Sequence, residues 1–228
     1  MGVLYLVRHG QAPAHAYTSG PTAPDAPGLT ELGFAQARAT GLELARQVPG
    51  FTTVISGGLP RQRATLATVL EAFSGAAGTV PDGPPIVDPG WDEYPVPELP
   101  GGSSPDSYAS PADYQRLLDA ALDRWVAGDS GSAESYTEYT ARTTAAAERA
   151  TAAAGPGETV LAVSSAGTIT ALVARAWGVP AERWPGLARA MVNASITRLL
   201  VGRRGLTVLS VNEHAHLSAT AVGLATFR

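Results

Sequence analysis

The sequence predicts an α/β fold, a three-layer α/β/α sandwich whose sheet is mostly parallel with an antiparallel edge strand. Two observations lead to this class. Short apolar runs rich in strand-forming residues alternate with longer segments whose apolar residues recur at helical spacing. Two further strand-like runs, residues 194–201 and 206–211, are separated by a short Gly- and Arg-containing turn and predict a terminal hairpin. With 228 residues, we expect one domain over 1–228.

The first predicted elements are a strand and a helix joined by a long loop. Residues 3–7 are apolar, rich in strand formers and too few to cross a membrane, so they predict a buried strand. Residues 11–28 are rich in Pro, Ala, Gly and Thr, which is typical of a loop. Thr30 suits an N-cap, because its hydroxyl can accept a backbone N–H, and a helix is predicted over 31–47.

The next segment repeats the order of strand, turn and helix. Residues 52–56 predict a second strand, and two glycines follow it. Pro60 fits the start of a helix, which the sequence predicts over about 61–73. Residues 86–88 then predict a short third strand.

A helical insertion is predicted at about 94–131. Its first part is rich in Pro, Gly and Ser, and a helix over 111–126 follows with its large apolar residues on one face. An insertion after a strand end could cap a site. An Ala-rich helix is predicted next, over about 133–154.

The clearest later strand is predicted over 158–164. It ends in a Ser-Ser-Ala-Gly turn, and a helix continues to Trp177. Gly178 and Pro180 close this helix, as these residue types commonly do. If this strand lies beside strand 3–7, the polar turns that follow the two strands meet in one crevice.

Composition excludes several chemistries. All 16 basic residues are arginines, so the chain has no lysine for a Schiff base or a P-loop. It has no cysteine, which excludes disulfides, thiolate catalysis and cysteine-based zinc sites. A net charge of −4 argues against a nucleic-acid partner. No segment has the length of a membrane span or the pattern of a signal peptide, and we expect a cytoplasmic protein.

A polar motif, Arg8-His9-Gly10, stands at the end of the first predicted strand. An imidazole beside a guanidinium suggests a nucleophile or base next to an anion clamp, and Gly10 lets the backbone approach a ligand closely. The segment resembles the signature of the histidine phosphatase superfamily, the phosphoglycerate mutase-like family. The resemblance covers residues 4–217 and implies that fold, a nucleophilic His9, an anion-binding Arg8, and substrate contacts from Gly10 and Gln11.

A second guanidinium is expected from the segment that starts the helix at 61–73. The family motif has the form Arg-Ala-x-Gln-Thr-Ala, and Arg61 and Thr65 match it, whereas its Ala and Gln positions differ. The resemblance therefore favours Arg61 as the second phosphate-binding residue. Arg63 is the alternative.

A general acid is expected after the third predicted strand. The family carries a Glu near a Trp at this place, and Trp91-Asp92-Glu93 resembles that arrangement. Shielding by Trp91 and Tyr94 could raise the pKa of the Glu93 carboxyl, which would suit it to protonate a leaving oxygen. Asp92 is the alternative.

The main departure from the family lies at Ser165. The family commonly reads Ser-His-Gly at this strand end, where the His contacts the transferring phosphoryl group, whereas this chain reads Ser164-Ser165-Ala166-Gly167. Ser165 and the N–H of Ala166 are expected to contact substrate in its place. A hydroxyl brings no positive charge, and losing one donor aimed at developing charge costs on the order of 100- to 1000-fold in rate.

The remaining histidines are expected to have structural roles. His15 is expected in a loop facing solvent, and the resemblance implies that His216 packs or forms hydrogen bonds. His214 and His216 could suggest a metal, but neither a carboxylate cluster nor a third histidine accompanies them in sequence, and we expect no metal site. Asn193 and Ser195 match the family and are expected to be structural.

The resemblance thus implies a histidine acid phosphatase-like hydrolase that cleaves a small phosphate ester through a phosphohistidine, with no cofactor. Two alternatives stay open. The fold could serve as a non-catalytic, phosphate- or metabolite-binding regulatory domain, with Ser165 as the mark of lost activity. It could also be a phosphoglycerate mutase-type phosphotransferase, although the insertion offers only Arg116 and Arg124 to hold a second phosphate.

Overall fold

The structure of the protein is a computed structural model that describes residues 1–13, 16, 28–101, 107–129, 132–203, 205–218 and 223–227. The strands of these residues form one sheet in the order β3-β2-β4-β1-β5-β6. Their bounds are Gly2–Arg8 for β1, Thr53–Ser56 for β2, Ile86–Val87 for β3, Thr159–Ser164 for β4, Ile196–Gly202 for β5 and Gly205–Glu213 for β6.

The sheet is mostly parallel, as predicted. Strands β3, β2, β4 and β1 run parallel to one another, and the terminal hairpin extends the sheet beyond β1. Within it, β5 is antiparallel to both β1 and β6. The pairing of β1 with β4 sets Arg8 opposite Ser164, so the polar turns after these two strands leave the sheet at the same edge.

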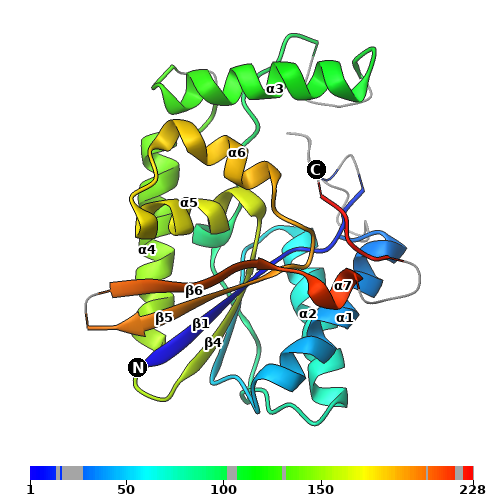
Figure 1. The fold of residues 1–228 in the computed structure, drawn as a ribbon, viewed down its shortest axis with the longest axis vertical. Helices are drawn as coiled ribbons and strands as arrows, with labels where there is room; N and C mark the ends of the chain where they lie inside the picture. The colour runs from blue at the N-terminus through cyan, green and yellow to red at the C-terminus, as the bar shows by residue number, and fades with distance from the viewer. Residues whose placement is uncertain are drawn as a thin grey trace.

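Helices cover both faces of the sheet, which gives the predicted three layers (Figure 1). The α-helices are α1 (Glu31–Gln47), α2 (Pro60–Gly75), α3 (Pro111–Val126), α4 (Tyr136–Ala153), α5 (Ala166–Trp177), α6 (Trp184–Arg189) and α7 (Ala215–Ser218), and short 3-10 turns span Pro89–Trp91 and Ala181–Arg183. Side chains of α1 and α2 share one core cluster with the sheet, and side chains of α4 and α5 share the other.

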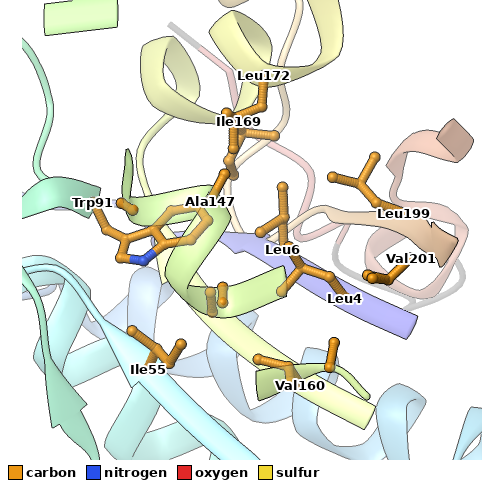
Figure 2. Close-up of a cluster of buried hydrophobic side chains, with 14 of the residues drawn as sticks. Leu4, Leu6, Ile55, Trp91, Ala147, Val160, Ile169, Leu172, Leu199 and Val201 are labelled. Atoms are coloured by element: carbon orange, nitrogen blue, oxygen red, sulfur yellow. The ribbon is translucent and has the colours of Figure 1, made fainter. Parts of the chain in front are cut away.

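Alternation along β1 divides its residues between these two clusters. Leu4 and Leu6 point toward α4 and α5, where they meet Trp91 and Ile169 (Figure 2). The residues between and after them, Tyr5 and Val7, join the cluster on the opposite face. A strand buried on both faces is a near-continuous apolar run, which is why residues 3–7 could be recognised as one.

The predicted strands and helices are confirmed, with shifts at their ends, whereas most of the predicted loop over 11–28 lies outside the described residues. Helix α4 begins at Tyr136 rather than at 133, because Ser135 caps it in a capping box with Glu138. Strand β5 begins at Ile196 rather than at 194, because Ala194 has a φ of 57° and cannot continue an extended strand. Helices α6 and α7 and the two 3-10 turns were not predicted, because they have too few residues for periodicity to show.

The predicted insertion supplies α3, which lies beyond α6 at the top of Figure 1. An ion pair of 2.5 Å joins Asp119 of α3 to Arg189 of α6. Trp125 of α3 also packs on Trp184, with ring centroids 5.9 Å apart. Among the described helices, none combines the length and apolarity that a membrane crossing requires.

Candidate active site

The candidate site lies where β1 and β4 end. The backbone N–H of His9 donates to the Ser164 carbonyl at 2.9 Å, which joins the two turns directly. The N–H of Gly10 donates to Thr65 Oγ1 at 3.0 Å, so the same turn is also held by α2. The two polar strand ends therefore meet, as the sequence predicts, and they do so beside α2.

Gly10 and Gln11 pack against the first turn of α1. A Cβ atom on Gly10 would overlap the Gly33 carbonyl, so only glycine allows this approach. The Gln11 N–H donates to Gln36 Oε1 at 2.8 Å, and its side-chain oxygen accepts from Thr30 Oγ1 at 2.8 Å. These contacts give both residues a role in fixing the turn that carries His9.

The imidazole of His9 is oriented by its own backbone neighbour. His9 is 2% exposed, and its Nδ1 lies 2.8 Å from the carbonyl oxygen of Gly10. Because a carbonyl oxygen only accepts, Nδ1 carries the proton in the neutral ring, and the lone pair lies on Nε2. The His9 carbonyl accepts from Asn193 Nδ2 at 3.1 Å, which gives Asn193 the structural role expected of it.

Two of the three candidate arginines are buried at the site. Arg8 donates to the Met191 carbonyl, and Arg61 donates from Nη1 to the Ala16 carbonyl at 2.6 Å. Both guanidinium charges lie close enough to Glu93 to favour its ionised form. The alternative, Arg63, is an exposed residue of α2.

Glu93 meets the N-terminal end of α5. Its Oε2 accepts the N–H of Gly167 at 3.0 Å, and its Oε1 lies 3.2 Å from the hydroxyl of Tyr139. Burial raises the pKa of the Glu93 carboxyl, and the Gly167 N–H, Arg61 and Arg8 oppose that rise. A Cβ atom at Gly167 would overlap Glu93 Oε1, so this glycine makes room for the carboxyl group.

The alternative acid, Asp92, points elsewhere. Its Oδ1 accepts the N–H of Gly58 at 2.6 Å, in the turn between β2 and α2. Burial raises the pKa of Asp92 as well, and hydrogen bonds from the Gly58 and Leu59 N–H groups oppose the rise. Asp92 therefore holds the β2–α2 turn, whereas Glu93 faces the end of α5.

Ser165, at the end of β4, has no exposed surface. Its Oγ accepts a hydrogen bond from Gln62 Nε2 at 3.0 Å, and the same Nε2 donates to the Trp91 carbonyl at 2.9 Å. Gln62 stands at one of the three positions where its segment departs from the family motif. Ala166 follows as the first residue of α5, where backbone N–H groups lack partners within the helix.

Sequence reasoning missed three residues that support this site. Gln62 holds the turn after β4, and Tyr139 and Thr168 continue the contacts of Glu93. The Tyr139 hydroxyl lies 3.1 Å from Thr168 Oγ1, which donates to the Asp92 carbonyl at 2.9 Å. Tyr139 was visible only as one residue of an Ala- and Thr-rich helix, which gives no sign of what its hydroxyl meets.

The other histidines lie away from these turns. His216 Nε2 is 3.0 Å from Thr40 Oγ1, in line with the hydrogen-bonding role expected of it, and His214 Nδ1 is 2.6 Å from the Asn212 carbonyl. Within the described ranges, no group of three or more His, Cys, Asp or Glu residues is arranged to hold a metal ion. His15 lies outside the described residues.

The chain is similar in sequence to one protein family and in structure to several phosphatases. The family model described as histidine phosphatase superfamily, branch 1, matches residues 4–214. A mycobacterial glucosyl-3-phosphoglycerate phosphatase in complex with VO3 is 24% identical, with 93% of this chain and 100% of that chain covered and a TM-score of 0.66. No curated protein matches the chain in sequence.

Two further structures show the same likeness. A phosphoserine phosphatase mutant from Entamoeba histolytica, in complex with phosphoserine, is 17% identical, with coverage of 95% and 100% and a TM-score of 0.65. A putative α-ribazole-5′-P phosphatase from Escherichia coli is 20% identical, with coverage of 94% and 98% and a TM-score of 0.66. At these identities, the likeness establishes that the chains share a fold.

Proposed function

Because the chain belongs to branch 1 of the histidine phosphatase superfamily, we propose that it hydrolyses small phosphomonoesters through a phosphohistidine at His9, without a metal ion or organic cofactor. The observation that carries this proposal is the contact between His9 Nδ1 and the Gly10 carbonyl. A neutral imidazole fixed in this tautomer presents an unprotonated Nε2, which is the atom a nucleophile at this position requires.

The arginines support a phosphoryl group as the target. Arg8 and Arg61 are buried and their charges lie close to Glu93, and a guanidinium can bind two phosphoryl oxygens at once. Their positive charge can offset the negative charge of the transferred group. The structurally similar phosphatases act, by their names, on phosphorylated small molecules, and we assign this chain the same broad class of substrate.

The proposed reaction has two steps. His9 Nε2 attacks phosphorus, the bond from phosphorus to the leaving oxygen breaks, and the Glu93 carboxyl gives its proton to that oxygen. The resulting Glu93 carboxylate then takes a proton from water while the water oxygen attacks phosphorus. The nitrogen–phosphorus bond breaks, phosphate leaves, and both His9 and Glu93 return to their starting states.

The surroundings of Ser165 favour a second candidate function, a non-catalytic phosphate-binding domain. Ser165 is wholly buried and its oxygen is engaged by Gln62, so its hydroxyl makes a weak substitute for a cationic imidazole at the substrate surface. The intact set of His9, Arg8, Arg61 and Glu93 still favours hydrolysis, since a binding domain needs neither a nucleophile nor an acid.

Geometry gives little support to a mutase. A mutase must hold a second phosphate, for which the insertion helix α3 offers only two cations. Arg116 and Arg124 of α3 are exposed, and Arg116 pairs with Asp113 at 3.6 Å. Arg189 of α6 is paired with Asp119.

Hydrolysis of an aryl phosphate, measured without added metal, tests the proposal. We expect turnover by the wild type and loss of turnover in His9→Ala. Vanadate binding should be measured on both proteins, because it reports the phosphate pocket without requiring chemistry. A wild type that binds vanadate but does not hydrolyse the ester would make the binding-domain function the better account.

A further inference from the structure

Three consecutive contacts run from Glu93 into the protein. Glu93 Oε1 lies 3.2 Å from the Tyr139 hydroxyl oxygen, and that oxygen lies 3.1 Å from Thr168 Oγ1. Thr168 Oγ1 in turn lies 2.9 Å from the backbone carbonyl oxygen of Asp92. Tyr139 and Thr168 have no exposed surface, so water cannot replace a partner that one of them loses.

The number of available hydrogens decides what this chain of contacts requires. The Asp92 carbonyl can only accept, so Thr168 must donate its one hydrogen there to satisfy the last contact. Tyr139 must then donate its one hydrogen to Thr168 to satisfy the middle contact. Tyr139 then has no hydrogen left for its contact with Glu93, so this contact is a hydrogen bond only if Glu93 Oε1 carries a hydrogen and donates it to Tyr139. All three contacts are hydrogen bonds at once only when Glu93 is a carboxylic acid.

We propose that Tyr139 and Thr168 are positioning residues that favour the protonated form of Glu93 and hold its proton on Oε1. This inference rests on the proposed function, because it explains how the general acid is kept ready. With Glu93 ionised, Tyr139 turns to donate to the carboxylate, and the two remaining hydrogens can satisfy only two of the three contacts. Ionisation therefore removes one buried hydrogen bond from the chain.

The groups in direct reach of Glu93 fit this assignment. The Gly167 N–H from α5 donates to Oε2 at 3.0 Å, whereas Oε1 meets the Tyr139 hydroxyl at 3.2 Å and the backbone N–H of Tyr94 at the longer distance of 3.3 Å, so we place the proton on Oε1. Burial raises the pKa of Glu93, whereas Arg8 of β1 and Arg61 of α2 favour ionisation. The hydrogen bonds from Glu93 through Tyr139 to Thr168 therefore raise the pKa of Glu93, as burial does, whereas the two guanidinium charges lower it.

The remaining charged groups nearby are engaged with other partners. The Asp92 carboxylate accepts from the Gly58 N–H rather than facing Glu93. Arg142 lies 5.3 Å from the centre of the Tyr139 ring, its guanidinium pairs with Glu134, and its Nη1 donates to the Asp92 carbonyl at 3.0 Å. Arg142 and Thr168 therefore share that carbonyl oxygen, whose two lone pairs can accept both hydrogens.

Tyr139 itself stays protonated in this surrounding. Burial and the nearby Glu93 raise its pKa well above the ordinary tyrosine value, so the hydroxyl keeps its hydrogen. When the leaving oxygen takes the proton of Glu93, the Tyr139 hydrogen swings from Thr168 to Glu93 Oε1. The same hydroxyl thus accepts from the acid and donates to the carboxylate, and the Glu93 proton turns from Tyr139 to the leaving oxygen as it is transferred.

The Glu93 pKa, measured by carboxyl carbon NMR on uniformly ¹³C-glutamate-labelled protein, tests the inference. The Glu93 signal is assigned from Glu93→Gln, and wild type, Thr168→Val, Tyr139→Phe and the double variant are titrated. Valine has the shape of threonine but cannot accept from Tyr139. We expect Thr168→Val to lower the Glu93 pKa by roughly half a unit to one unit, the size of one hydrogen bond.

The double variant distinguishes an effect carried by the Tyr139–Thr168 hydrogen bond from a general effect of packing on the Glu93 pKa. In the Tyr139→Phe background, Thr168→Val should leave the Glu93 pKa unchanged, because the hydroxyl that links the two is gone. Thr168→Ser, which retains the hydroxyl, should titrate as the wild type does. A pKa that is unmoved by Thr168→Val, or that moves equally in the Tyr139→Phe background, would overturn the inference. Should Thr168→Val not fold, Thr168→Ala makes the same comparison.

The titration requires no turnover, so the inference and the proposed function can fail separately. A lowered Glu93 pKa in an inactive protein would support the hydrogen-bonded chain and count against phosphatase activity. An active enzyme whose Glu93 pKa is the same in the wild type and in Thr168→Val would leave the proposed function in place and refute the inferred role of Tyr139 and Thr168.

Discussion

The imidazole Nδ1 of His9 lies 2.8 Å from the carbonyl oxygen of Gly10, the next residue in the chain. This contact needs no other element to form it, yet it decides which ring nitrogen can react. Gly10 is in turn held between Thr65 and the first turn of α1, so the orientation of the imidazole depends on packing from both α1 and α2.

Gly167→Ala should displace Glu93. The added methyl group would overlap Glu93 Oε1, and a misplaced general acid typically costs about 100- to 10,000-fold in rate. The measurement is kcat for an alkyl phosphate. Gly186→Ala, where an added Cβ meets nothing within 4 Å, is the matched control and should keep the wild-type kcat. Equal activities in the two variants would mean that Glu93 has another role.

Arg61→Ala and Arg63→Ala should differ sharply, although the residues are two positions apart. Arg61 is buried beside Glu93, and Arg63 is exposed. Loss of one cationic donor to the transferred phosphoryl group should lower kcat/KM on the order of 100-fold for Arg61→Ala, and Arg63→Ala should remain near wild type. The reverse ranking would assign the phosphate contact to Arg63.

Glu93→Gln should affect substrates according to their leaving groups. An alkyl alkoxide needs the proton that Glu93 supplies, and we expect a loss of about 100- to 10,000-fold in kcat, with a smaller loss for an aryl phosphate. In the wild type, activity should fall as the pH rises and Glu93 loses its proton. Because burial raises the pKa of Glu93, this fall should lie above the ordinary glutamic acid pKa, and it should be absent in Glu93→Gln.

His216 should make stability depend on pH. Burial lowers its pKa, so the folded state binds the proton of His216 less readily than the unfolded chain does. Its contribution is complete above the ordinary histidine pKa of about 6.5 and is lost as the pH falls through the lowered value. The drop in melting temperature between pH 7.5 and pH 5 should therefore be smaller in His216→Gln than in the wild type. Equal drops in wild type and His216→Gln would show that His216 does not contribute to acid destabilisation.

Much of the fold follows from the sequence because its signals are local. The apolar run of β1, the Thr30 cap of α1 and the hairpin of β5 and β6 each depend on residues close together in the chain. The meeting of the two polar turns depends on β1 and β4 being neighbours, and the sheet satisfies that condition. The start of α4 differs from the prediction because a capping box, rather than composition, sets where this helix begins.

The candidate site was only partly predictable, because many of its contacts join residues far apart in the sequence. Asp92 and Glu93 are adjacent acids, and Asp92 has the extended backbone in which neighbouring side chains point in opposite directions, so composition cannot say which of the two faces the site. Tyr139 and Thr168 matter because two helices bring their hydroxyl groups together beside Glu93. A helical pattern shows which face is buried but not which polar group it meets there.

Chemical trapping of the phosphorylated protein shows most directly whether His9 is the nucleophile. Acid-labile, base-stable phosphate should appear on the wild type during turnover of a phosphomonoester, and mass spectrometry should locate it on His9. Glu93→Gln should accumulate more of this species if its second step is slowed more than its first. Turnover without any phosphorylated His9, or undiminished turnover in His9→Ala, would show that the reaction does not proceed through a phosphohistidine at His9.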